Sequence, residues 1–112
     1  MYVQTTILQV KPECVPQALA LLNNDLYKEF CTSIKGICQV IVLESAEEPG
    51  RLVALSFWDS MANAQEAIFD PRYAAWMAEL RDWLIVSPER TGYRLLAELP
   101  LLSHPGFSFR AL

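Results

Sequence analysis

Residues able to do acid–base chemistry are few in this chain and lie far apart. His104 is the single histidine, and because an unperturbed imidazole titrates near neutral pH, it is the default general base if the chain is an enzyme. Arg72 and Tyr73 are neighbours, and they combine a guanidinium that can hold an anionic oxygen with a phenol that can donate a proton. We therefore take His104, Tyr73 and Arg72 as the catalytic candidates. The alternative is that His104 is solvated in a tail and that the other two are surface residues.

Aromatic side chains supply candidate walls for a binding site. Trp58 stands where a strand is expected to meet a helix, so it could stack on a planar ligand and offer its indole N–H, or it could simply plug the core. Trp76 and Trp83 are seven residues apart, which also fits a core- or dimer-facing stripe. Thr6 could place a hydroxyl inward, although threonine is a good strand former in any case. We expect the substrate-binding surface to include Trp58, Thr6, Trp76 and Met77.

Missing motifs and the cysteine spacing disfavour several kinds of site. The chain has no GxSxG, HExxH, phosphate-binding glycine loop or dinucleotide fingerprint, and its four glycines could not readily form one. Cys14, Cys31 and Cys38 are odd in number and lack CxxC or Cys/His spacing, so we expect reduced thiols rather than disulfides or a zinc site. Hydrolase, kinase and dehydrogenase functions are disfavoured. We expect no metal and no cofactor, and a mostly apolar pocket suited to a flat, hydrophobic aromatic molecule.

The composition predicts one domain that hides part of its surface in an oligomer. Of the 112 residues, 53% are hydrophobic and 20% are charged, which is more apolar than an average soluble domain. The net charge is -4 and the nine basic residues are spread along the chain, so nucleic acid is not an expected partner. The N-terminus lacks a signal-peptide pattern and no apolar run approaches the ~20 residues of a membrane span. We therefore expect a cytoplasmic protein with no membrane partner.

Hydrophobic periodicity places these residues on alternating strands and helices. Apolar residues at three- and four-residue spacing predict helices, the second of which is restarted by an Asp70-Pro71 cap. The expected elements are a strand over 3–10, a helix from 16 to about 30, a strand over 37–43, a turn over 47–50, a strand over 51–58, helix from 61 to about 86, and a strand over 91–99. We expect residues 1–99 to form one domain and residues 100–112 to form a tail.

The order of these elements predicts an α+β fold of the ferredoxin-like type. Two strand-helix-strand units, βαββαβ, give a four-stranded antiparallel sheet with helices on one side. The other face of the sheet would then carry apolar residues from several strands, and leaving it in water would forfeit about 25 cal/mol per Å². The economical solution is a second copy packed sheet to sheet. We therefore expect a homodimeric alpha-beta barrel.

Several short motifs occur here in an order that resembles a known family. They are Val10-Lys11-Pro12-Glu13 after the first strand, Gly36 before the second, Phe57-Trp58-Asp59-Ser60 at the end of the third, and Asp70-Pro71-Arg72-Tyr73 in the last helical region. Together they make residues 3–99 resemble the antibiotic biosynthesis monooxygenases, a family of dimeric alpha-beta barrels. The resemblance implies a site between sheet and helices in each subunit. Oxygenases that use no metal or flavin on aromatic polyketides or quinols belong to that family, as do haem degraders.

Few of the polar residues of the family's polyketide oxygenases have a counterpart here. In those enzymes the Trp of a Trp-x-Ser motif works with an Asn four residues earlier, a Tyr six residues later and an Arg in the following helix. Trp58 matches the Trp. The Asn and Tyr positions are Ala54 and Ala64, and the Arg position falls near Met77 or Ala78. Three of the four polar groups are therefore replaced.

The positions used by the haem-degrading relatives are also changed. Their pocket uses an Asn on the first strand, a Trp nine residues after the motif Trp, and an axial His ten residues beyond that. The corresponding positions here are Thr5 or Thr6, Ala67 and Met77. Methionine can in principle ligate iron, but these replacements disfavour haem degradation.

Two functions from different classes follow. The first is a cofactor-independent monooxygenase acting on a quinol or polycyclic aromatic substrate, with Trp58 and Tyr73 as pocket walls and His104 or Arg72 promoting substrate deprotonation. The second is a non-catalytic dimeric barrel that binds a hydrophobic small molecule or serves as an assembly module. The replaced polar positions favour the second reading, and the family resemblance favours the first.

Overall fold

The chain alternates strands and helices in the predicted order. The structure is a computed structural model and describes residues 1–98 of the 112. Its elements are β1 (Tyr2–Gln9), the 3-10 helix η1 (Pro12–Cys14), α1 (Val15–Leu22), α2 (Asp25–Ser33), β2 (Ile37–Glu44), β3 (Arg51–Trp58), α3 (Met61–Ala67), α4 (Pro71–Leu80), the 3-10 helix η2 (Arg81–Trp83) and β4 (Glu89–Arg94). None of the helices within residues 1–98 is long and apolar enough to cross a bilayer.

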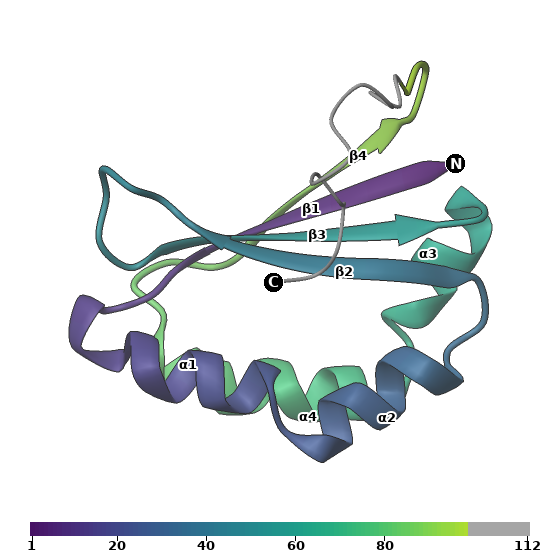
Figure 1. The fold of residues 1–112 in the computed structure, drawn as a ribbon. Coiled ribbons are helices and arrows are strands. Elements are labelled where there is room, and N and C mark those ends of the chain that lie inside the picture. The colour runs from purple at the N-terminus through teal and green to yellow at the C-terminus, as the bar shows by residue number, and fades with distance from the viewer. Residues whose placement is uncertain (99–112) are drawn as a thin grey trace, which may run out of the picture.

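The four strands form one antiparallel sheet in the order β2-β3-β1-β4. The central strand β1 pairs with β3 on one side and with β4 on the other, and β3 also pairs with β2. Figure 1 shows α1, α2 and α4 lying along one face of this sheet, with α3 beside its end. The predicted ferredoxin-like α+β arrangement is therefore confirmed.

The prediction of a single helix from 16 to about 30 is wrong. The structure has two helices in this region, with a break at Asn23 and Asn24. Asn24 has an extended backbone, and its side-chain oxygen accepts a hydrogen bond from the backbone N–H of Tyr27 at 2.8 Å. Asparagine side chains compete with the helix for such donors, which is why they favour caps over helix interiors. The break turns α2 against α4, where it contributes to the roof of the cavity described below.

The end of the second helical region also differs from its prediction. A regular helix was expected to about Val86, but α4 ends at Leu80 and only one 3-10 turn follows. Leu84 forms a β-bridge with Val10, and the backbone N–H of Ile85 donates to the carbonyl of Gln9 at 2.8 Å. Residues 84–86 therefore continue toward the sheet. The last strand accordingly runs over 89–94 instead of 91–99, and the predicted tail, 100–112, lies outside the described residues.

Two helix caps position the C-terminal half of the site. The Ser60 hydroxyl accepts from the backbone N–H of Asn63 at 3.2 Å and starts α3. The Asp70 carboxylate accepts from the backbone N–H of Arg72 at 2.9 Å, and Pro71 follows it as the first residue of α4. The Asp70 cap agrees with the sequence prediction, as does the start of α3 at residue 61. Both caps satisfy helix N–H groups that would otherwise lack partners.

Alternation along the strands separates an inner face, toward the helices, from an outer face. On the inner face, Leu8, Leu52 and Trp58 are buried and pack against the helices in two adjoining clusters. No helix of residues 1–98 covers the outer face (Figure 1). The register assigns to it the half-buried or exposed apolar residues Val3, Ile7, Ile41, Leu43, Val53, Leu55, Phe57 and Tyr93.

Candidate functional site

A cavity of about 100 Å³ lies between the inner face of the sheet and the helices. Its floor is formed by alternate residues of β1 and β3, because the pleat turns them to the same side. The floor residues are Gln4, Thr6 and Leu8 of β1 and Ala54, Ser56 and Trp58 of β3. The helices supply the rest of the wall, chiefly with apolar side chains. This is the location that the family resemblance implies for a site.

Three aromatic rings build one wall of the cavity. Trp76 of α4 is only 8% exposed. Its ring centroid lies 4.2 Å from that of Tyr27 and 4.8 Å from that of Phe30, which meets it edge-on at 79°. Edge-to-face and tilted pairs of this kind contribute stability beyond the area they bury. Trp76 therefore belongs both to the core and to the cavity wall, two roles between which the sequence did not decide.

The indole of Trp58 is held by Ser56, which precedes it by two residues on β3. Trp58 is 4% exposed, and its Nε1 donates to the Ser56 hydroxyl at 2.8 Å. The Ser56 hydroxyl in turn donates to the backbone carbonyl of Gln4 at 3.4 Å. Because the indole proton is used within the protein, Trp58 presents its ring to the cavity and not its donor.

Tyr73 lines the cavity from α4 and is itself covered by a cation. The guanidinium carbon of Arg90, on β4, lies 4.5 Å from the centre of the Tyr73 ring. Partial burial lowers the pKa of the Arg90 guanidinium from its ordinary value, yet arginine stays protonated at neutral pH. The contact is a cation–π pair that fixes the orientation of the tyrosine ring.

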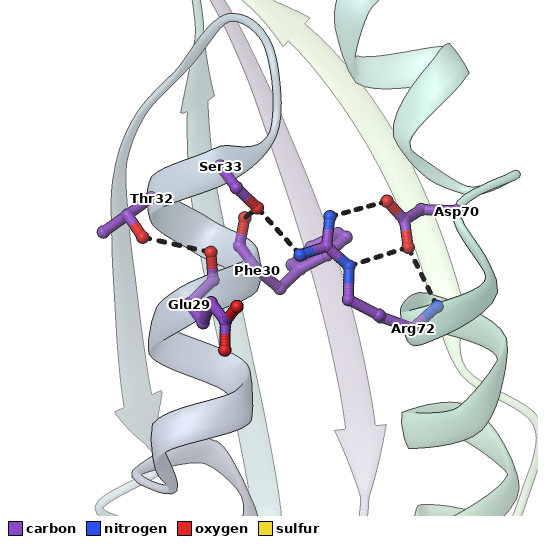
Figure 2. A network of polar contacts seen from close by, with 6 residues as sticks. All are labelled: Glu29, Phe30, Thr32, Ser33, Asp70 and Arg72. Carbon is purple, nitrogen blue, oxygen red and sulfur yellow. Dashed lines mark hydrogen bonds and ion pairs between the residues drawn. The ribbon is translucent and has the colours of Figure 1, made fainter.

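Arg72 belongs to a contact between two helices, as Figure 2 shows. Its Nε and Nη2 donate to the two carboxylate oxygens of Asp70 at 3.0 and 2.8 Å, and its Nη1 donates to the Ser33 hydroxyl at 2.8 Å. The guanidinium also lies 5.0 Å above the ring of Phe30. Hydrogen bonds from Arg72 lower the pKa of the Asp70 carboxyl. Arg72 is thus committed to joining α2 to α4.

Two further ionisable side chains face the cavity from α2. Burial raises the pKa of the Tyr27 phenol well above its ordinary range, and the neighbouring Cys31 adds to this shift. Burial also raises the pKa of the Cys31 thiol. Both groups are therefore protonated at neutral pH, so neither supplies a base or a thiolate there. Cys14, Cys31 and Cys38 are all free thiols.

The structure brings all four predicted binding residues together. Thr6, Trp58, Trp76 and Met77 all line the one cavity, and the catalytic candidate Tyr73 lines it too. The other two catalytic candidates are not placed there. Arg72 faces Asp70 and Ser33, and His104 lies outside the described residues.

Four cavity residues with polar or ionisable side chains were not predicted from the sequence: Gln4, Tyr27, Cys31 and Ser56. Strand parity could have found two of them, because Gln4 has the parity of Thr6 and Ser56 has that of Trp58. The helix break hides the others from a simple periodicity analysis. Within residues 1–98, no three His, Cys, Asp or Glu side chains gather as a metal site would require.

Comparison with known proteins shows what this arrangement is similar to. No protein-family model and no curated protein sequence matches the chain. Solved structures do match it. A protein from Nitrosomonas europaea, provisionally named an antibiotic biosynthesis monooxygenase, has a TM-score of 0.75 and 20% identity, covering 87% of this chain and 100% of that one. A protein of the same provisional name from Caulobacter crescentus has a TM-score of 0.77 and 16% identity, covering 86% and 90%.

The name of a third structure also states that the protein works without a cofactor. SnoaB from Streptomyces nogalater, a cofactor-independent oxygenase solved as a point mutant, has a TM-score of 0.70 and 16% identity, covering 89% of this chain and 97% of that one. At such identities the likeness establishes the fold, and a fold hosts more than one function. The chain has the fold of the antibiotic biosynthesis monooxygenases, which confirms the fold that the sequence resemblance predicted.

Proposed function

We propose that this chain, with its antibiotic biosynthesis monooxygenase fold, is an oxygenase that works without a cofactor on a small quinol. The observation that carries the proposal is the cavity between sheet and helices, walled by Trp58, Trp76 and Tyr27. Flat aromatic walls in a largely apolar pocket suit a planar ring. SnoaB, which shares the fold, is named a cofactor-independent oxygenase, and this supports the same class of chemistry here.

The size of the cavity favours one ring over a polycyclic substrate. Its volume of about 100 Å³ is below the ~150 Å³ of an engineered cavity that takes up benzene. It is also below the ~300–1,000 Å³ of pockets for drug-sized ligands. A single-ring quinol requires modest side-chain adjustment, whereas a polycyclic molecule requires the helices to move away from the sheet.

The proposed reaction balances without an outside electron source. A hydroquinone with a free ring C–H gains one atom of O₂ at that carbon, the other oxygen atom leaves as water, and the product is a hydroxyquinone. The ring loses the four electrons that O₂ accepts, and two substrate hydrogens leave in the water. The protein has to hold the ring and remove a phenolic proton, because the quinolate gives an electron to O₂ far more readily than the quinol does.

His104 is the proposed base for that proton. Tyr27 and Cys31 line the cavity but have pKa values raised by burial, so at neutral pH they hold their own protons. Arg72 is bound to Asp70 and Ser33, which leaves it a structural role in this proposal. Tyr73 and Trp58 act as walls.

Oxygen uptake tests the proposed function. Protein stripped of metals and flavin is mixed with trimethylhydroquinone, which keeps one ring C–H, and uptake is followed with an oxygen electrode. We expect uptake above the uncatalysed rate, a lower rate in Trp58→Phe and His104→Ala, and an unchanged rate in the exposed control Ser87→Ala. No uptake above the uncatalysed rate with any single-ring quinol would contradict the proposal.

A second candidate function is a non-catalytic barrel that binds a small hydrophobic molecule. Alanine at positions 54 and 64 and the internal hydrogen bond of the Trp58 indole favour it, because they leave few groups to polarise a substrate. Saturable binding of a quinol that quenches tryptophan fluorescence, with no oxygen uptake, would support this second function over the first.

We further propose that the chain forms a homodimer through the outer face of the sheet. The apolar residues on that face come from all four strands, and no helix of residues 1–98 covers them. Burying them would stabilise the assembly by about 25 cal/mol per Å². A second copy of the same face is self-complementary under two-fold symmetry.

A further inference from the structure

A row of uncharged polar groups crosses the floor of the cavity. Gln4 on β1 and Ser56 on β3 are direct cross-strand partners, and Thr6 is the next inward position along β1. All three line the cavity, in an otherwise largely apolar wall. Polar groups in such surroundings are stable only when they find hydrogen-bond partners.

The three groups differ in how far the protein already uses them. The Ser56 hydroxyl accepts from Trp58 and donates to the backbone carbonyl of Gln4. Within residues 1–98, the side chains of Gln4 and Thr6 make no hydrogen bond to another protein group. A glutamine amide offers two donors and an acceptor, and a threonine hydroxyl offers one donor. The floor therefore presents free donors and acceptors to whatever occupies the cavity.

Among the described residues, the cavity lining supplies these hydrogen-bonding groups but no free charge that could balance the charge of a ligand. Its helical part includes the apolar side chains of Leu21, Phe30 and Trp76. The nearby cations are engaged elsewhere, since Arg72 binds Asp70 and Ser33, and Arg90 lies over the Tyr73 ring. A carboxylate entering this space would lose its hydration without gaining a counter-ion from residues 1–98, which is far more costly than the transfer of a neutral amide or hydroxyl.

We propose that Gln4 is a specificity-determining residue that selects uncharged aromatic rings carrying a carbonyl or hydroxyl group. Its amide binds that oxygen, with the Thr6 hydroxyl beside it, while the ring packs against Trp58 and Trp76. A ring that carries a carboxylate of nearly the same shape in place of the neutral group is rejected. This inference rests on the proposed function, because it names the class of molecule that the same cavity admits, namely a quinol that enters in its neutral form.

The matched probes 4-fluorobenzamide and 4-fluorobenzoate test the selection. They have nearly the same shape and differ in charge, and binding is followed by broadening of their ¹⁹F NMR lines during titration with the full-length protein. The titration is run at about pH 8, where the benzoate is ionised and an unperturbed histidine is neutral. We expect the amide to bind at least about tenfold more tightly than the carboxylate.

Substitution of Gln4 identifies the residue responsible. In Gln4→Leu the affinity for 4-fluorobenzamide should fall by about five- to tenfold, the usual effect of one lost hydrogen bond. The affinity for fluorobenzene, which has no oxygen, should not fall. Gln9→Leu is the matched control, because it makes the same change on the outer side of the same strand, and it should leave both affinities unchanged. Gln4→Met provides the same loss of polarity with a more flexible side chain if the leucine variant folds poorly.

Three results would overturn the proposal. They are equal binding of benzamide and benzoate, an equal loss of fluorobenzene and benzamide binding in Gln4→Leu, and the absence of ¹⁹F broadening with every probe. The probes do not react with oxygen, so this outcome is separate from that of the oxygen-uptake experiment. Selective binding without uptake would remove the oxygenase and keep the role of Gln4, whereas uptake without selectivity would do the reverse.

Discussion

The hydrogen bond between Trp58 and Ser56 links two residues on the floor of the cavity. The donor, Nε1 of Trp58, is buried with the residue, and Ser56 is the acceptor at 2.8 Å. A buried donor that loses its partner costs more than the hydrogen bond itself contributes. Ser56 therefore positions the indole. Removal of the Ser56 hydroxyl should lower the stability of the protein and also alter the cavity.

Ser56→Ala should lower the free energy of unfolding by about 1–3 kcal/mol, because it leaves the indole N–H without a partner. Urea unfolding followed by tryptophan fluorescence measures this. Ser87→Ala, which removes a hydroxyl from an exposed loop position, is the control and should change little. Equal stabilities for the two variants would mean that the indole has found another acceptor.

Cys31 should react with iodoacetamide only at a pH above the ordinary range for a thiol. Its pKa is raised by burial, so at a given pH less thiolate is present, and the thiolate is the nucleophile. Modification is located by mass spectrometry across a pH series, with the protein unfolded in urea as the reference. The pH midpoint for Cys31 should be higher in the folded protein. Equal midpoints in the folded and unfolded protein would show that the Cys31 thiol is not desolvated. The exposed Cys38 serves as the internal comparison and should be labelled first.

Side-chain chemistry predicted several residues of the cavity lining, and contacts between distant elements determine the others. Trp58, Trp76 and Thr6 were expected and line the cavity. Arg72 was expected as a catalytic candidate and is bound by Asp70 and Ser33. A sequence pattern shows that a guanidinium is present, but only the position of α2 relative to α4 determines which oxygens it reaches.

At the scale of elements, the joint between α2 and α4 controls the roof of the cavity. Arg72 at the start of α4 reaches across to Ser33 at the end of α2 and lies over Phe30 (Figure 2). Asp70 holds Arg72 and caps α4 at the same time. Because Phe30 and Trp76 pack together directly beneath this joint, loosening it should disturb the aromatic wall.

Asp70→Asn should lower the Tm at neutral pH, and the difference from the unchanged protein should close on acidification. The pKa of Asp70 is lowered by hydrogen bonds from Arg72. The stability that this gives is therefore complete above the ordinary carboxyl pKa and is lost as the pH falls through the lowered value. Thermal unfolding between about pH 7 and pH 3 measures the effect. Glu79→Gln, an exposed carboxylate of the same helix, is the control.

A Tm difference for Asp70→Asn that stays constant down to the lowest pH would contradict this interpretation. Asparagine can still cap the helix, so a constant difference would point to packing rather than charge. High salt should also narrow the difference at neutral pH, since the Asp70 and Arg72 side chains are partly exposed and such pairs are screened.

Element boundaries were predicted where the sequence carries local signals and missed where it does not. Ser60 and Asp70 are cap residues, and the helices begin where they were expected. The interruption at Asn23 and Asn24 lies inside a continuous apolar stripe, so periodicity alone spans it. The end of α4 is set by a contact distant in sequence, the pairing of Leu84 with Val10, which no local pattern reveals.

At the scale of the whole molecule, residues 1–98 place helices on one face of the sheet and none on the other, where the strand register puts apolar side chains. The single antiparallel sheet with helices on one side was predicted from the succession of elements, because a βαββαβ chain has few ways to form such a sheet. The assembly proposed for the outer face has a direct test.

Leu55→Asp should convert the proposed dimer into a monomer. Leu55 lies on β3, near the middle of the outer face, and a carboxylate buried there between two copies would lack a partner. Size-exclusion chromatography with light scattering measures the mass, and circular dichroism checks the fold. Phe69→Asp changes an aromatic residue that is 81% exposed beyond the end of α3 and should leave the mass unchanged. A monomeric unchanged protein would refute the dimer.

The most direct test of the oxygenase proposal is the fate of ¹⁸O₂. Protein stripped of metals and flavin is incubated with trimethylhydroquinone under ¹⁸O₂, and the product is analysed by mass spectrometry. The predicted result is a hydroxyquinone with one ¹⁸O atom and the second label in water, formed more slowly by Trp58→Phe. An unlabelled quinone, or no product beyond that of the protein-free reaction, would contradict the claim that this cavity oxygenates a quinol.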